Sequence, residues 1–138
     1  MATYGYHSGP TTTVEMPAAN TAAIAEGDLV KRDGVAGYIT PCGAGELPIG
    51  VAKEMCAVPT DDGDYTFMVY TSSDTRFVYP PDTGSVTVGL NGLKMDVGGA
   101  QAIDIDASTD GVVFVDKARV NENQLIVHFD FNAGYAGV

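Results

Sequence analysis

Tryptophan is absent from this chain, and basic residues are few: seven lysines and arginines stand against eighteen aspartates and glutamates in 138 residues, a formal net charge of −11 at pH 7. A core without tryptophan must be built from aliphatic side chains, phenylalanine and tyrosine. So acidic a chain is repelled by phosphate backbones, which argues against direct nucleic-acid binding. The charge suits docking onto a basic or mixed protein surface.

Cysteine and long apolar runs are also scarce. The two cysteines, Cys42 and Cys56, are too few for a disulfide framework and lack C-x-x-C spacing, so we expect two reduced thiols, with one cross-strand disulfide as the alternative. No apolar run approaches the roughly 20 residues that span a bilayer. Residues 1–10 lack the basic head and apolar core of a signal peptide, so we expect synthesis in the cytoplasm.

A sustained helical pattern is missing as well, because no stretch of about eleven residues repeats apolar side chains at helical spacing between caps. Glycine, in contrast, is abundant at 17 residues, and proline adds 7. Short apolar runs closed by Gly, Pro or Asp predict strands joined by tight turns, hence an all-β fold. The expected strands are residues 29–30, 35–40, 49–52, 65–71, 76–79, 86–88, 93–97, 102–105, 112–115 and 124–131.

Two segments define this β-structure best. Residues 25–54 hold three short apolar runs with turns at Asp33-Gly34 and residues 43–45, which predicts a small Gly-rich barrel or sheet. Residues 124–131 alternate cleanly, with Leu125, Val127, Phe129 and Phe131 on one face and His128 on the other. In addition, Asn91-Gly92 predicts a hairpin turn between Leu90 and Leu93.

The chain divides by composition into three parts. Residues 1–24 are small and polar, with two prolines as breakers, and predict an extended N-terminal arm that is mobile alone and ordered on a partner. The alternative is that residues 12–16 form a first strand of the domain's own sheet. Residues 25–131 are the all-β domain, and residues 132–138 are expected to be a flexible, Gly- and Ala-rich tail.

One loop resembles a cation site. Oxygen-bearing side chains recur at alternating positions, as in a calcium loop: Asp104, Asp106, Ser108 and Asp110. The pattern fails where the sharp turn needs glycine, because Thr109 stands there, and where a closing carboxylate is needed, because Val115 stands there. We therefore expect a polar hairpin loop between Ile103 and Val112 and hold a weak metal site as the alternative.

Other catalytic or metal-binding patterns are not found in the sequence. The two histidines, His7 and His128, have no second His or Cys nearby, and His128 is expected to be a half-exposed strand residue. No serine lies in a G-x-S-x-G turn, and no carboxylate pair stands in an apolar setting that would raise a pKa. We expect no enzymatic activity and no cofactor.

Three short motifs carry a family resemblance: GDLV at residues 27–30, GYITP at residues 37–41 and ELPIGVAKE at residues 46–54. Together they resemble the start of head decoration, or capsid cement, proteins of tailed phages and prophages. The resemblance implies a small β-barrel or β-tulip domain on the exterior of the virion. Its partner would be the major capsid protein, with homo-oligomers, often trimers, at local threefold axes.

The resemblance also implies that the N-terminal arm orders on the shell. The side chains of the arm expected to contact the capsid are Tyr4, Tyr6, His7, Val14 and Met16. Two alternatives remain open. One is another virion β-domain, such as a tail- or fibre-associated module or a minor shell subunit. The other is a carbohydrate- or cation-binding β-module that uses the loop at residues 104–110.

Overall fold

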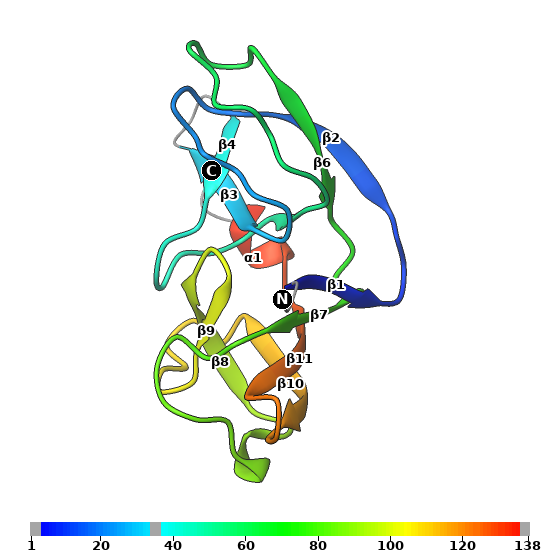
Figure 1. The fold of residues 1–138 in the computed structure, drawn as a ribbon, viewed down its shortest axis with the longest axis vertical. Helices are drawn as coiled ribbons and strands as arrows, with labels where there is room; N and C mark the ends of the chain where they lie inside the picture. The colour runs from blue at the N-terminus through cyan, green and yellow to red at the C-terminus, as the bar shows by residue number, and fades with distance from the viewer. Residues whose placement is uncertain (1–3, 34–36, 136–138) are drawn as a thin grey trace.

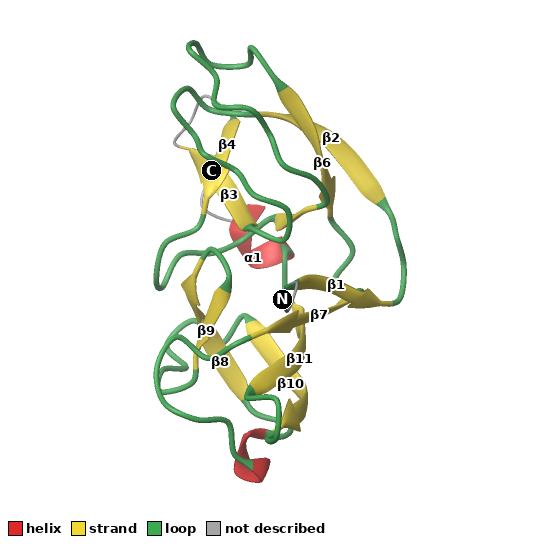
Figure 2. Cartoon of the chain, viewed as in Figure 1, coloured by secondary structure: helices red, strands yellow, loops and turns green. Residues whose placement is uncertain are grey.

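The computed structural model describes residues 4–33 and 37–135, and these residues form two antiparallel sheets, one of six strands and one of five. Figure 1 shows the two sheets at opposite ends of the long axis, with β1 and β7 at the end of the six-stranded sheet that lies nearer the five-stranded sheet. Helical structure in the described residues is limited to a 3-10 turn, η1 (Val88–Leu90), and a short helix, α1 (Asn132–Tyr135) (Figure 2). The all-β prediction is confirmed.

The five-stranded sheet has the order β2-β6-β5-β3-β4. It curls, because Ala18, just after β2, forms a parallel bridge with Ile39 in β4. Closure stops at this bridge, since Pro17 ends β2 and has no N–H to donate. The closed form of the expected barrel is not found in the described residues. The strands are β2 (Thr13–Pro17), β3 (Leu29–Asp33), β4 (Tyr38–Pro41), β5 (Gly50–Ala52) and β6 (Thr66–Tyr70).

The six-stranded sheet has the order β1-β7-β11-β10-β8-β9. Its last strand in the chain, β11, is central and alternates as predicted: Leu125, Val127 and Phe129 are fully buried, whereas Ile126 and His128 are partly exposed. The strands are β1 (Gly5–Ser8), β7 (Arg76–Tyr79), β8 (Lys94–Gly99), β9 (Ala102–Asp104), β10 (Val113–Arg119) and β11 (Gln124–Phe129).

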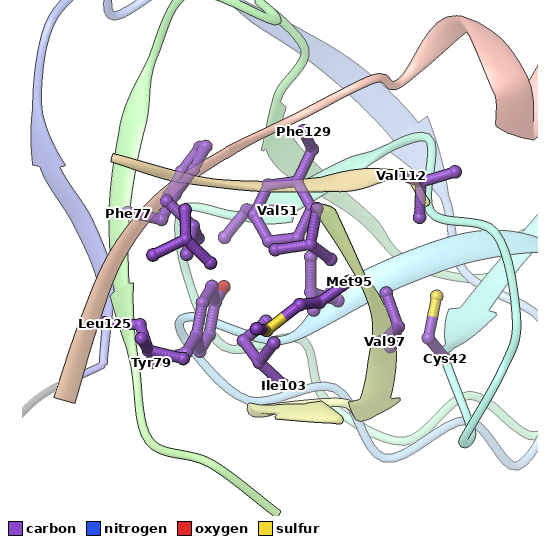
Figure 3. Close-up of a cluster of buried hydrophobic side chains, with 14 of the residues drawn as sticks. Cys42, Val51, Phe77, Tyr79, Met95, Val97, Ile103, Val112, Leu125 and Phe129 are labelled. Atoms are coloured by element: carbon purple, nitrogen blue, oxygen red, sulfur yellow. The ribbon is translucent and has the colours of Figure 1, made fainter. Parts of the chain in front are cut away.

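Two apolar clusters cover the two faces of the five-stranded sheet. Along β3, Leu29 faces the cluster shared with the six-stranded sheet, and Val30 faces a second cluster on the opposite side. Figure 3 shows Phe77 and Phe129 of the six-stranded sheet converging with Val51 of β5 in the shared cluster. The shared cluster therefore joins the two sheets.

The N-terminal segment differs from the predicted arm. β1 pairs with β7, and β2 pairs with β6 over its whole length, as the alternative for residues 12–16 proposed. Met16, Ala18 and Ile24 are buried in the second cluster, so residues 4–24 contribute to the core. The pairing partners of β1 and β2 lie more than forty residues away in the chain, and local composition carries no trace of such pairings.

The expected strand at residues 86–88 and the hairpin at Asn91-Gly92 are both wrong. Gly92 does turn with a positive φ of 79°, but η1 precedes it in place of a strand. The Asn91 side chain accepts a hydrogen bond from the N–H of Ala118 at 2.6 Å, which fixes the turn against β10. Asn91 thus makes a tertiary hydrogen bond to Ala118, which the Asn-Gly sequence alone does not predict.

The C-terminal tail is partly ordered. Residues 132–135 form α1, where a Cβ added to Gly134 would lie only 2.4 Å from the carbonyl oxygen of Pro48. This close approach docks the helix onto the loop before β5. Residues 136–138 of the expected tail, and the part of the Asp33-Gly34 turn and of the strand at 35–40 that falls on residues 34–36, lie outside the described residues.

Candidate functional site

The five residues expected to contact a capsid lie on β1, on β2 and just before β1, and they differ in exposure. Tyr4 and Tyr6 lie at the junction of the two sheets, whereas Val14 and Met16 lie on β2. Val14 is 46% exposed, but Met16 is buried in the second cluster. His7 is exposed on β1, and its ring Nδ1 lies 3.0 Å from the hydroxyl of Ser8.

An aromatic hollow forms where β1 meets the five-stranded sheet. Its volume is about 160 Å³, and its rings include Tyr6 and Tyr70, which stack at 5.2 Å with an interplanar angle of 20°. Tyr6 remains 42% exposed. The residues that line the aromatic hollow are Tyr4, Tyr6, Glu26, Gly27, Ala52, Lys53 and Tyr70.

The floor of the aromatic hollow depends on glycine at position 27. Gly27 has a φ of 90°, and a Cβ at this position would lie 2.4 Å from the carbonyl oxygen of Tyr4. Only glycine combines this backbone conformation with so close an approach. The hydroxyl of Tyr79 donates a 2.6 Å hydrogen bond to the carbonyl oxygen of Gly27 from inside the core. Tyr79 of β7, in the six-stranded sheet, therefore fixes the backbone at Gly27, which lines the hollow.

Two opposite charges, those of Glu26 and Lys53, lie in the lining of the aromatic hollow. Burial, the neighbouring Tyr6 and the carboxylate of Glu26 all raise the pKa of the Tyr70 hydroxyl, in that order of size. The side chains of Glu26 and Lys53 form no ion pair with the described residues. The hollow thus carries one carboxylate and one ammonium group, neither of them in an ion pair with a described residue, beside three tyrosine rings.

β2 presents an open edge of the five-stranded sheet (Figure 1). The N–H of Thr71 donates to the carbonyl of Thr12, and the N–H of Ala18 donates to the carbonyl of Tyr65. Because hydrogen-bonded and non-hydrogen-bonded pairs alternate in an antiparallel ladder, the backbone groups of Thr13 and Glu15 point away from β6. Another chain could pair with these groups.

The acidic loop at residues 104–111 is organised by a carboxylate that the sequence analysis did not consider. Asp96 in β8 is buried, and its two oxygens accept hydrogen bonds from the N–H groups of Thr109, Asp110 and Gly111 at 3.1, 2.8 and 2.9 Å. The loop is not the predicted hairpin, because β9 and β10 pair on opposite sides of β8. The loop therefore passes from one side of β8 to the other.

The four candidate metal ligands do not converge. Asp104 accepts the N–H of Asp106 at 3.0 Å, which is a turn contact. The described residues contain no group of three or more His, Cys, Asp or Glu side chains that could hold a metal ion. Ser108 and Asp110 lie in the same loop, where Asp110 offers its backbone N–H to Asp96.

A charged and aromatic cluster lies on the outer face of the six-stranded sheet. The carboxylate of Asp116 lies 2.6 Å from Nε of Arg76 and 3.0 Å from Nδ1 of His128. The His128 ring stacks on Phe114 at 4.8 Å. His128 is a partly exposed strand residue, as predicted. The register between β10 and β11 places Phe114 directly opposite it. The cluster joins strands β7, β10 and β11 through Arg76, Asp116 and His128.

The two cysteines are free and lie in different clusters, Cys42 in the shared cluster and Cys56 in the second. Their reduced state agrees with the first expectation. Burial raises the pKa of Cys42 to about 12, and burial followed by the charge of Glu54 raises the pKa of Cys56.

We expect both thiols to react slowly with a disulfide reagent at pH 8 in the folded protein, because the thiolate is the reactive form. The measurement is the rate of aromatic disulfide exchange, with the same protein in denaturant as the control that releases both thiols. Rapid labelling of one equivalent in the folded state would contradict this prediction for one of the two thiols, and rapid labelling of two equivalents would contradict the buried position of Cys42.

Comparison with known proteins adds no assignment: no protein-family model and no curated protein matches the chain. Within residues 4–33 and 37–135, none of the helices has the length and apolar character to cross a membrane.

Proposed function

We propose that this chain is a structural virion protein that binds the outer surface of an assembled tailed-phage capsid and stabilises it. The major capsid protein is the partner, and the copies group as homo-oligomers, with trimers favoured. The relation to small β-barrel or β-tulip decoration domains is part of this proposal, and no cofactor or catalytic step is required.

The observation that carries the proposal is the open edge of β2. It offers outward N–H and C=O groups at Thr13 and Glu15 together with the exposed side chain of Val14. An extended segment of a neighbouring chain can pair with such an edge through main-chain hydrogen bonds, and side-chain pockets then add specificity. This lies in the N-terminal region that was expected to contact the shell.

Two further features support the proposal. The three motifs that resemble decoration proteins fall on or beside β3, β4 and β5, which are neighbours in the same five-stranded sheet as β2. A decoration subunit also gains affinity because many identical sites act together on one shell, so a short edge contact per subunit is sufficient.

Point variants test the proposal better than truncation, because deletion of the first strands would remove buried Met16 and Ala18. We expect Val14→Asp to weaken attachment to expanded, undecorated heads at least about tenfold, since it places an unpaired carboxylate in the interface. The measurement is co-sedimentation with heads of the phage that encodes the chain.

The matched control is Val120→Asp, because Val120 is as exposed as Val14, at 46%, but lies beyond the end of β10 in the six-stranded sheet. Both variants should keep the wild-type melting temperature. The edge proposal fails if both variants sediment like the wild type. The capsid function itself fails if the wild-type chain does not sediment with the heads.

A further inference from the structure

We infer that the aromatic hollow binds a cationic side chain of a partner protein, and that it prefers arginine to lysine. The inference rests on the proposed function only for the identity of that partner, the shell protein. The site itself follows from the residues that line the hollow.

The ring arrangement suits a flat cation. Tyr6 and Tyr70 stack on each other, and Tyr6 stays accessible at the mouth. A guanidinium or ammonium group placed against an aromatic ring is attracted by the ring quadrupole. Arginine fits better than lysine, because its planar group stacks on a ring and at the same time donates two parallel hydrogen bonds to a carboxylate.

The charge at the hollow provides the second contact. The carboxylate of Glu26 has no ion-pair partner among the described residues, and it is close enough to Tyr70 to help raise the pKa of that hydroxyl. A bound guanidinium would neutralise it. Lys53 also lines the hollow and would repel a cationic ligand, so removing its charge should strengthen binding.

The size of the hollow limits what can enter. Pockets for drug-sized ligands and cofactors span roughly 300–1,000 Å³, whereas this hollow measures about 160 Å³. It therefore admits the head of one side chain and excludes a nucleotide or a larger cofactor. The guanidinium group matches this volume, and Glu26 in the lining offers it a carboxylate.

The test uses Nα-blocked arginine amide as the probe, with blocked citrulline amide as a neutral analogue of the same shape and methyl glucoside as a sugar. We expect the arginine probe to shift the backbone amide NMR signals of Gly27 and Ala52 saturably, and the other two probes to leave them unchanged. Glu26→Gln should weaken binding about tenfold, through loss of the charge-assisted hydrogen bonds, and Lys53→Met should strengthen it.

Glu26 and Lys53 are exposed, so neither variant should alter folding. Absence of saturable shifts, or equal binding of citrulline or the sugar, would overturn the inference, as would Glu26→Gln binding like the wild type. The free probe needs no capsid. Failure of the probe with normal attachment to heads therefore rejects this site alone, and normal probe binding without attachment rejects the proposed function alone.

Discussion

Replacement of Phe77 with alanine is expected to lower the free energy of unfolding by about 3–5 kcal/mol, the range for removal of a large buried aromatic ring. Phe77 is fully buried, and its ring centroid lies 5.8 Å from that of Phe129, 6.2 Å from that of Phe131 and 6.0 Å from that of Tyr70. The cavity would open between the two sheets. Since whole domains have stabilities of roughly 5–15 kcal/mol, much of the total would be lost.

Urea denaturation followed by far-ultraviolet circular dichroism measures this loss. The matched control is Tyr65→Ala, because Tyr65 is an aromatic residue that is 49% exposed; we expect its effect to stay within about 0.5 kcal/mol. A loss below about 1 kcal/mol for Phe77→Ala would mean that the shared cluster does not join the sheets as described.

Replacement of Asp96 with alanine is expected to cost about 2–4 kcal/mol, because it leaves the N–H groups of Thr109, Asp110 and Gly111 without their acceptor. Asp96→Asn should cost less. The oxygen Oδ1 serves Asp110 and Gly111 and Oδ2 serves Thr109, so an asparagine can keep two of the hydrogen bonds. The amide NH₂ of the asparagine then faces the N–H of Thr109, and because both groups are donors, no hydrogen bond forms there.

Thermal unfolding with and without calcium completes this experiment. Asp106→Ala is the control, because the Asp106 side chain is exposed and its contact in the loop is made by its backbone N–H. We expect a change within about 0.5 kcal/mol and no shift with calcium. A clear rise in melting temperature with calcium that disappears in Asp106→Ala would restore the metal-site alternative.

Strand positions could be predicted where the signal is local. β7 matches the predicted residues 76–79, because Pro80 and Pro81 end the apolar run and mark its boundary in the sequence. β11 was predicted from its two-residue alternation, and the buried and exposed faces follow that alternation. These features depend on neighbours in the chain.

Pairing could not be predicted in the same way. The N-terminal segment was expected to be an arm because it is small and polar, yet Gly5 pairs with Val78 and Thr13 pairs with Tyr70. The energy of such a strand comes from partners that are distant in the sequence. The same reason explains the acidic loop, whose conformation depends on Asp96 in a neighbouring strand.

Only some of the residues that line the aromatic hollow could be identified from the sequence. Tyr4 and Tyr6 were singled out as aromatic residues near the chain start, but Glu26, Lys53 and Tyr70 carry no motif. They meet because Gly27 lets the backbone approach Tyr4 closely and because β1 lies beside β5. The glycine in the GDLV motif was a local signal of a turn, and its role in closing the hollow required the fold.

The central place of β11 has a consequence for synthesis on the ribosome. The strands of the five-stranded sheet all lie within the segment that ends at Tyr70, so they can leave the exit tunnel and pair early. β11 must lie between β7 and β10, and it emerges after every other strand of the two sheets. Until it arrives, Leu29 and Val51 on the early sheet have no complete cover, so the nascent chain exposes an apolar face that favours aggregation. A chain interrupted before Phe129 therefore cannot complete its core.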